Sequence, residues 1–141
     1  MKITAEMLAA KRDELRKITC NGNELDRMMS DYVKEAWQGV EVGDGVTVHL
    51  WTDAEAYTVI ARTAKTLTLR RCKAIRDFTP EWVVGGFSAI CTNQSNQEWH
   101  YEEDEKGKIE KAHWSDKRNG FYVSGCCRCS LGRHEYYDYN F

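Results

Sequence analysis

Proline is almost absent from this chain. There is one proline among 141 residues, which leaves no room for a proline-rich linker. Long apolar runs are missing as well, and none approaches the roughly 18 residues that a membrane-spanning helix needs. The first segment, MKITAEMLAAKRDELRK, is charged throughout and lacks the apolar stretch of a signal peptide. The length favours one domain, or one domain with a short appendage, and we expect the protein to stay in the cytosol.

Strong positive charge and catalytic motifs are also lacking. The net charge is −2, whereas proteins that bind a DNA or RNA duplex usually carry a basic domain, so we expect no duplex partner. There is no G-x-S-x-G elbow, no Walker phosphate-binding loop and no H-E-x-x-H pair. The four histidines are isolated in the sequence. We therefore predict that the protein is not an enzyme and has neither catalytic residues nor a cofactor.

Six cysteines are present, and in a reducing compartment we expect free thiols. Cys126 and Cys129 form a C-x-x-C, which is half of a zinc site, but no other cysteine or histidine pair repeats that spacing. A redox C-x-x-C normally opens a helix, and this one lies in a segment with a strand pattern. The pattern favours a strand with small buried thiols and an outward-facing Arg128, with no bound metal.

The first 40 residues have helical periodicity. Residues 1–19 are predicted to form a helix with Thr4 as N-cap. A second helix is predicted over 24–38, with Asn23 as N-cap and Gly39 as its stop. Its apolar stripe consists of Leu25, Met28, Met29, Tyr32, Val33, Ala36 and Trp37. Because this stripe is wide for a helix resting on one small sheet, we expect part of it to pack against another subunit.

The periodicity changes after Gly39. Alternating and β-branched segments separated by short polar turns predict a series of strands. Within this series, residues 98–114 resemble a hairpin with its turn near Lys106 and Gly107. The predicted fold is α+β: an N-terminal helical pair (1–40) followed by a β-rich ligand-binding domain (41–141). The β part is expected to be a mainly antiparallel twisted sheet or a partly closed barrel.

Three segments carry candidate binding chemistry. Residues 56–76 hold six basic side chains and no acid, which suits either a solvated strand end or a face that binds a small anion. Residues 85–99, GGFSAICTNQSNQEW, combine an aromatic ring with amides that can read the edges of a base, or form a glycine bulge and a polar loop. The chain closes on GRHEYYDYNF, which is rich in aromatics for a terminal segment. This tail is either a docked last strand or a binding surface.

The β part resembles a family of small phage-encoded proteins, the first type of Thoeris anti-defence sponges. The resemblance lies in the hairpin TD-x-x-AYTVI, the loop GGF…CTNQ, the acidic turn YEEDEKGKI and the terminal GRHEYYDYNF, and it covers roughly residues 42–141. It implies a phage anti-defence protein in the host bacterial cytoplasm. Such proteins bind and sequester, without cleaving, the cyclised ADP-ribose signal made by bacterial immune TIR proteins, and some also bind small cyclic oligonucleotides.

The resemblance also implies an assembly and a set of ligand contacts. The protein would be a homodimer or a higher homo-oligomer, such as a hexamer, with pockets at subunit interfaces. Phe87 would stack on the base, Asn93 would bond to base or ribose, Arg128 and Arg133 would hold the diphosphate, and His134 would lie at the pocket mouth. The rings of Tyr136, Tyr137, Tyr139 and Phe141 would form a final strand packed into the sheet or an interface.

Two other functions remain open at the level of sequence. The chain could be an SH3-like or β-barrel interaction module that binds a host protein through the barrel and the helix at 24–38. It could also be a phosphodiesterase acting on the same nucleotides, although the sequence offers no cluster of metal ligands for that chemistry.

Overall fold

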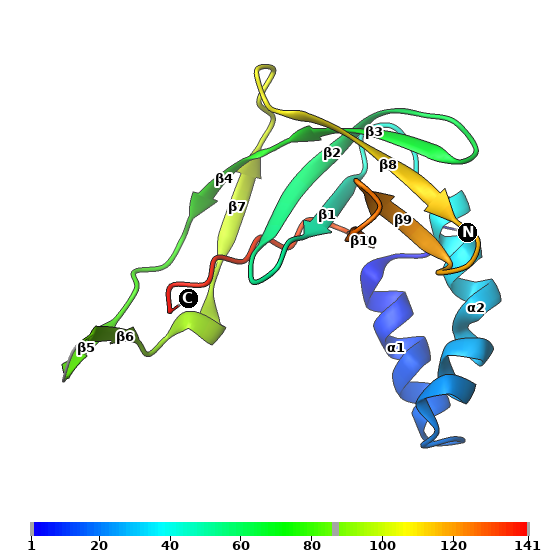
Figure 1. Cartoon of the computed structure of the whole chain (residues 1–141), viewed down its shortest axis with the longest axis horizontal. Coiled ribbons are helices and arrows are strands. Elements are labelled where there is room, and N and C mark those ends of the chain that lie inside the picture. The colour runs from blue at the N-terminus through cyan, green and yellow to red at the C-terminus, as the bar shows by residue number, and fades with distance from the viewer. Residues whose placement is uncertain (1, 86–87, 141) are drawn as a thin grey trace.

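Within residues 2–85 and 88–140, which the computed structural model describes, two helices precede an antiparallel sheet that closes into a six-stranded barrel (Figure 1). The helices are α1 (Ala5–Arg16) and α2 (Gly22–Gln38). The barrel strands, in spatial order, are β1 (Gly45–His49), β10 (Cys127–Leu131), β9 (Gly120–Val123), β8 (Ile109–Ser115), β3 (Thr66–Arg71) and β2 (Ala54–Arg62). The predicted α+β class is confirmed.

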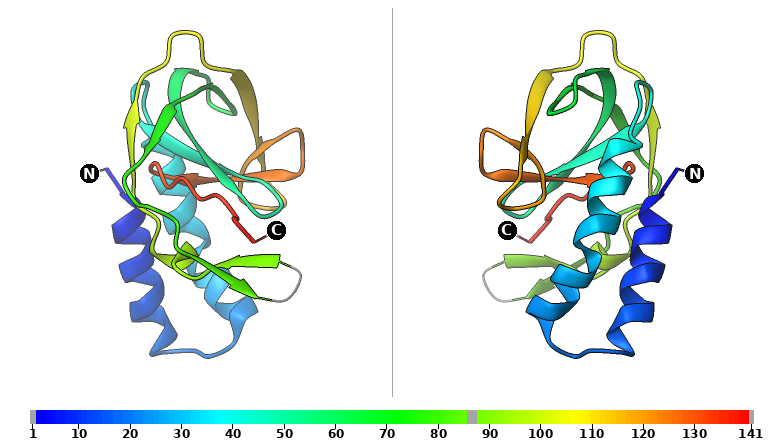
Figure 2. Two further views of the ribbon diagram at one scale, coloured as in Figure 1. Left: turned by 90° about the vertical axis from the view of Figure 1, so that its left-hand side faces the viewer. Right: turned by 90° about the vertical axis from the view of Figure 1, so that its right-hand side faces the viewer.

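Two strand pairs and a short 3-10 helix form an arm that extends from the barrel. The first pair is β4 (Lys73–Arg76) with β7 (Trp99–Glu102), the second is β5 (Trp82–Gly85) with β6 (Ser88–Cys91), and the helix is η1 (Gln94–Asn96). Figure 1 shows the arm and the helical pair at opposite ends of the barrel. The side views in Figure 2 show the C-terminal segment, in red, running between the barrel and β5–β6.

The predicted hairpin at 98–114 is wrong. β7 pairs with β4, and β8 pairs with β3 and β9. The turn does form, because the amide of Gly107 donates to the carbonyl of Asp104 at 2.9 Å. The turn connects β7 to β8, but these strands pair with the earlier strands β4 and β3 and not with each other. The alternating residues correctly predicted strands in this segment. Which strands pair depends on segments distant in sequence, and the local pattern did not predict it.

The helix caps are local features, and two of the four were predicted. The Thr4 side chain accepts a hydrogen bond from the amide of Met7 at 3.2 Å, as expected for the N-cap of α1. Gly39 ends α2, also as predicted. The N-cap of α2 is Asn21, not Asn23, because the Asn21 side chain accepts from the amides of Asn23 and Glu24 at 3.0 and 3.2 Å.

The apolar stripe of α2 is shared between two partners within the same chain. Leu25 and Met29 pack on Leu15 of α1, whereas Ala36 and Trp37 pack against the barrel. Most of the stripe is thus buried within one chain, while Met28 remains exposed. The expectation that part of the stripe packs against another subunit stays a prediction.

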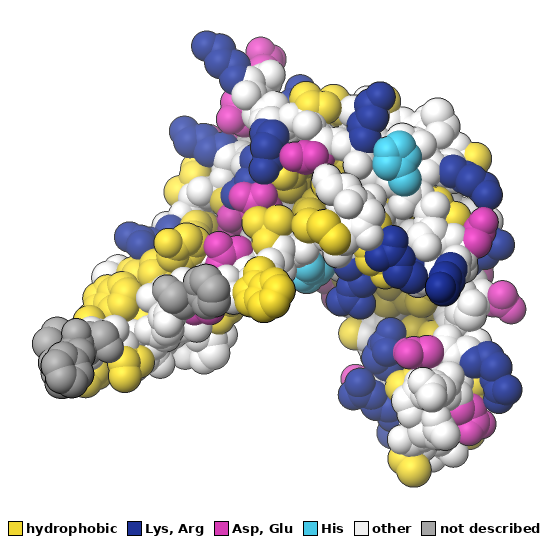
Figure 3. Space-filling view, viewed as in Figure 1, with side chains coloured by type: hydrophobic (Ala, Val, Ile, Leu, Met, Phe, Trp, Pro, Cys, Tyr) yellow, Lys and Arg dark blue, Asp and Glu magenta, His cyan; other side chains and the backbone are white. Residues whose placement is uncertain are grey.

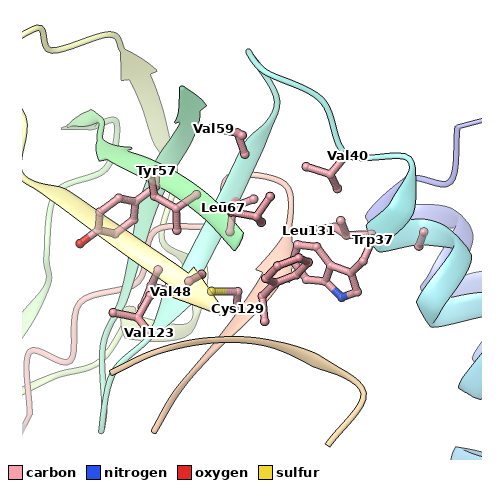
Figure 4. Close-up of a cluster of buried hydrophobic side chains, with 14 of the residues drawn as sticks. Trp37, Val40, Val48, Tyr57, Val59, Leu67, Val123, Cys129 and Leu131 are labelled. Carbon is pink, nitrogen blue, oxygen red and sulfur yellow. The ribbon is translucent and has the colours of Figure 1, made fainter. Parts of the chain in front are cut away.

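The barrel core is built from the inward-facing residues of all six strands (Figure 4). Trp37 closes one end and meets Phe121 edge-to-face, with ring centroids 5.3 Å apart. The buried strand residues are Val46, Val48, Tyr57, Val59, Leu67, Leu69, Ala112, Phe121, Val123, Cys129 and Leu131. Each large apolar side chain buried here stabilises the fold by about 1.5–3 kcal/mol. The barrel is therefore the rigid frame that positions the tail.

The C-terminal tail is docked, and it joins the barrel to the arm. A β-bridge pairs Tyr136 with Ala54, with hydrogen bonds of 2.8 and 2.9 Å between their main chains. Further along, Tyr139 lies edge-to-face with Phe78 and Trp82 of the arm, at centroid distances of 5.9 and 6.0 Å. Phe141, predicted to share this packing, lies outside the described residues. The aromatic character of the tail thus serves its docking.

Candidate functional site at the root of the tail

The root of the tail is a turn fixed by one buried hydroxyl. Gly132 follows β10 with φ of +82°, in the left-handed region that glycine adopts without strain. Thr47 is fully buried, and its hydroxyl donates to the carbonyl of Gly132 at 2.8 Å while accepting from the amide of His134 at 2.8 Å. The turn places the side chains of Arg133 and His134 on the outer surface of β1.

The side chain of Arg133 crosses β1 at Gly45, where the absence of a side chain leaves room for it. A Cβ at Gly45 would lie 3.0 Å from Nη1 of Arg133 and closer still to its Cγ, so only glycine lets the arginine lie flat here. Nη2 donates to the Thr58 hydroxyl at 2.9 Å, and more weakly to the Gly43 carbonyl and the Glu103 carboxylate, each at 3.4 Å. Nη2 makes all the hydrogen bonds that Arg133 forms with the described residues, which leaves Nε and Nη1 available for an anion.

The carboxylate of Glu103, which contacts Arg133, is itself held by two other side chains. The Thr58 hydroxyl donates to Glu103 at 2.7 Å, and Arg70 reaches the same carboxylate at 3.2 Å. The hydrogen bond from Thr58 lowers the pKa of Glu103, and burial opposes that shift less strongly than Thr58, Arg70 and Arg133 promote it. Glu103 is therefore ionised at neutral pH and holds one edge of Arg133 in place.

Arg133 and His134 separate two hollows. The first, of about 330 Å³, lies against the start of α1, and its wall includes Lys2, Thr4 and Asp44. Lys2 forms an ion pair with Asp44. Glu6 and Asp44 on the same wall offset the charges of Lys2 and Arg133. A phosphate here would be held by Arg133 and by the N-terminus of α1.

The second hollow, of about 630 Å³, lies between the tail and the arm. Its wall contains aromatic rings from both sides: Trp99 and Tyr101 from β7, and Tyr136 from the tail. Three acids also line it: Asp77, Glu98 and Glu135. The charge of Glu135 is offset, because its carboxylate receives two hydrogen bonds from Arg71, at 2.8 and 2.7 Å. Ring faces beside an arginine are the groups that bind a nucleobase next to its phosphate.

Arg128 lies away from these hollows, on the exposed face of β10 beside the helical pair. The predicted alternation holds here, since Cys129 is buried and burial raises the pKa of its thiol to about 12. Between Arg128 and His134 lies His49, whose ring is 2.8 Å from the Ser130 hydroxyl. Burial lowers the pKa of His49, and the charges of Arg128 and His134 lower it further.

The remaining predicted contacts lie in the arm. Asn93 uses its amide to close the arm loop: Nδ2 donates to the Thr79 carbonyl at 2.7 Å and Oδ1 accepts from the Glu81 amide at 2.8 Å. Phe87 lies outside the described residues. The described chain thus brings Arg133 and His134 together. It places Arg128 in a groove between the helical pair and β9–β10, and it does not bring Asn93 to Arg133 and His134.

Sequence reasoning missed several residues of this site. The rings of Trp99 and Tyr101 fall in the segment EWHYEEDE, which was read mainly for its acids. Lys2 carries no local signal, because its role depends on a contact with Asp44, 42 positions away. The clue for Gly45 was a glycine at the start of a β-branched strand, since such a glycine often marks the close approach of another group.

The described residues contain neither a cluster of metal ligands nor a helix suited to crossing a membrane. No group of three histidine, cysteine or acidic side chains among them is arranged to hold a metal ion. None of the helices within the described ranges has the length and apolar character to span a membrane. Comparison of the chain with known proteins gave no matching family model, no matching curated protein and no matching solved structure.

Proposed function

We propose that this protein binds and sequesters a cyclic nucleotide, of the cyclised ADP-ribose type or a small cyclic oligonucleotide, without cleaving it. The observation that carries the proposal is the position of Arg133: it lies between a hollow at the N-terminus of α1 and an aromatic hollow, with Nε and Nη1 free of hydrogen bonds to the described residues. The residue resemblance to phage Thoeris anti-defence sponges supports the same function. In that role the protein would act in the cytoplasm of the infected bacterium.

The two hollows suggest how a ligand would lie. The diphosphate would sit at Arg133 and His134, beside the N-terminus of α1. A base would stack in the second hollow against the rings of Trp99 or Tyr136. Stacking contributes about 1–3 kcal/mol per base, and each charge-assisted hydrogen bond about 1.5–3 kcal/mol. Tight binding therefore needs no covalent chemistry.

We also propose that the protein works as a homodimer or a higher homo-oligomer, such as a hexamer. The arm hairpin β5–β6 exposes Trp82, Val83 and Ile90, at 48%, 56% and 56% of their surfaces. Figure 3 shows hydrophobic side chains gathered along the arm. A two-stranded hairpin is marginally stable alone in water, so a second copy covering these side chains would stabilise it.

The deciding experiment is retention followed by heat release. The protein is incubated with cyclic ADP-ribose or with a cyclic trinucleotide, passed over a desalting column, heated and analysed by chromatography. Intact nucleotide recovered after heating supports sequestration, and degraded nucleotide indicates a phosphodiesterase instead. Retention of neither nucleotide overturns the proposal.

Variants of Arg133 test the site itself. Arg133→Ala should weaken binding by about 2–4 kcal/mol, as expected when one partner of a desolvated charge pair is removed. Arg133→Lys should recover only part of the loss, because an ammonium lacks the planar fork of donors. Arg16→Ala, an exposed arginine in the last turn of α1, serves as the matched control. Unchanged binding in Arg133→Ala would exclude this site even if the protein retains nucleotide.

A further inference from the structure

A groove on another part of the molecule has the features of a protein-docking site. It lies between the helical pair and the β9–β10 strands and has a volume of about 620 Å³. Its apolar wall is formed by the half-buried Leu8 and Val33, with the buried Met29 and Leu131 behind them. Its charged side chains are five basic residues and one acid: Arg12, Arg27, Lys117, Arg118, Arg128 and Asp26. We call this surface the basic groove.

The charge of the basic groove is opposite to that of the whole chain. The protein has a net charge of −2, yet five of the six charged residues here are cationic. Asp26 lies 3.6 Å from Arg12 and offsets that one charge. Arg27, Lys117 and Arg128 are exposed and form no ion pair with any described residue. Figure 3 shows Lys and Arg side chains around hydrophobic ones where the barrel meets the helical pair.

Part of the cationic rim is held in a fixed position. The guanidinium of Arg118 lies 3.7 Å from the centre of the Tyr122 ring, and its Nη1 donates to the Gly125 carbonyl at 2.8 Å. Nearby, Nδ2 of the Asn119 side chain donates to the carbonyl of Ser30 at 3.0 Å. This hydrogen bond joins the β8–β9 turn to α2. A rim that is already ordered loses less side-chain entropy when a partner binds.

The chemistry of the groove distinguishes a protein partner from a phosphate ligand. Phosphate sites converge backbone amides and buried donors on one point. Here the cations are on the rim and the wall between them is apolar, which is the arrangement of a protein interface, with an apolar centre, a polar rim and arginine enriched. Amphipathic helices bind grooves of this kind through apolar residues on one face. Opposite charge on the partner would steer its approach.

We propose that the basic groove docks an acidic amphipathic segment of a partner protein. Apolar side chains of that segment, spaced as on one face of a helix, contact the half-buried Leu8 and Val33. Its carboxylates face Arg27, Lys117 and Arg128 on the rim. This interaction is independent of the nucleotide site, because Arg133 and His134 do not line the groove.

Selection from a displayed library of random 16-residue peptides tests the proposal. The intact protein is the bait, and Arg27→Glu/Arg128→Glu is the counter-selection bait. Both substituted side chains are exposed, so the variant should fold, which circular dichroism checks. The expected result is enrichment of peptides that combine net negative charge with apolar residues at i, i+3, i+4 and i+7. Absence of enrichment over the counter-selection would overturn the proposal.

A synthetic copy of the most enriched peptide then separates docking from simple charge attraction. Its binding is measured by fluorescence anisotropy, with a scrambled peptide of the same composition and a single-stranded oligonucleotide of 16 nucleotides as competitors. Arg27→Glu/Arg128→Glu should bind at least about tenfold more weakly. Lys73→Glu/Lys111→Glu makes the same charge change outside the groove and should bind normally. Equal binding of the scrambled peptide, or stronger binding of the oligonucleotide, would contradict a protein-docking groove.

Discussion

The side chain of Asn140 pairs with the main chain of Cys91 in both directions. Its Oδ1 accepts from the Cys91 amide at 2.7 Å, and its Nδ2 donates to the Cys91 carbonyl at 3.0 Å. A carboxamide here takes the place that a neighbouring strand would occupy beside β6. Gln97 does the same for Tyr137 of the tail, with hydrogen bonds of 3.0 and 2.6 Å. Tail and arm are thus joined by side-chain amides that mimic a sheet.

Removing the Asn140 amide should therefore loosen the arm while leaving the barrel intact. Each hydrogen bond contributes about 1 kcal/mol, so Asn140→Ala should lower the local opening free energy of β6 by about 2 kcal/mol. Hydrogen exchange at the Cys91 amide measures this change. Asn140→Asp keeps the acceptor and loses the donor, and its effect should be intermediate. Unchanged exchange at Cys91 in both variants would contradict the pairing.

The contact of Gly45 with Arg133 predicts strong coupling between two substitutions. Gly45→Ala places a Cβ against the arginine side chain, so it should destabilise the protein by about 1–3 kcal/mol, as overpacking does. In an Arg133→Ala background that obstacle is gone, and Gly45→Ala should be neutral or slightly stabilising, because alanine reduces the entropy of the unfolded chain. Denaturant unfolding of the two single variants and the double variant tests this. Additive effects would show that Arg133 does not lie over Gly45.

The lowered pKa of His49 makes stability depend on pH in a defined direction. Its folded pKa lies below the ordinary value of 6.5, so the unfolded chain binds more protons as pH falls below 6.5. The stability that neutral His49 contributes is complete above pH 6.5. It is lost as the pH falls through the pKa of His49 in the folded state. Unfolding measured between pH 5 and 7 should therefore show a slope that His49→Gln reduces.

Arg128 should account for part of that shift. Arg128→Gln removes one positive charge near the imidazole, so the pKa of His49 should rise toward 6.5 without reaching it, because burial remains the larger cause. An NMR titration of the imidazole ring protons measures the value. Arg16→Gln on α1 is the control and should leave the titration unchanged. A His49 pKa equal in wild type and Arg128→Gln would place Arg128 outside the range of the imidazole.

Exposed apolar residues on the arm predict how the assembly can be broken. If β5–β6 contacts a second copy, Trp82→Glu/Ile90→Glu should reduce the mass measured by light scattering to that of a monomer. The barrel melting temperature should change little, because neither residue belongs to the core. Tyr32→Glu on α2 is a contrasting variant that should lower stability, since Tyr32 packs against the core within one chain. A monomeric wild type would refute the proposed assembly outright.

The parts of the fold that were predictable depend on neighbours in sequence. The Thr4 cap and the Gly39 stop use only backbone groups a few residues away, so local chemistry identified them. The helix start at Asn21 was missed because both Asn21 and Asn23 can cap, and their geometry around Gly22 decides between them. The alternating segments were correctly read as strands, whereas the partners of β7 and β8 were not.

The candidate site is harder to predict because its residues meet from distant segments. Arg133 was assigned through the resemblance in the terminal GRHEYYDYNF, and the structure places it just after a turn at Gly132. Its partners Thr58 and Glu103, however, are 75 and 30 positions away. Asn93 was chosen for amide chemistry that suits a base, but that amide is engaged by the main chain of its own loop. Composition identifies which groups can bind, and only the fold determines which remain free to do so.

The closure of the barrel by β1 and β10 has a consequence for incomplete chains. Val46 pairs with Leu131 across the seam, and the Thr47 hydroxyl reaches 85 positions along the chain to Gly132. In a nascent chain, or in a fragment cut before Cys127, β10 is missing, so β1 and β9 each have an unpaired edge. Apolar side chains that face the barrel interior in the whole protein lie beside these edges. Such edges recruit strands from other molecules, so these fragments should aggregate or engage chaperones instead of persisting as partial barrels. Since the seam joins such distant segments, barrel closure should also be a late and slow step of folding.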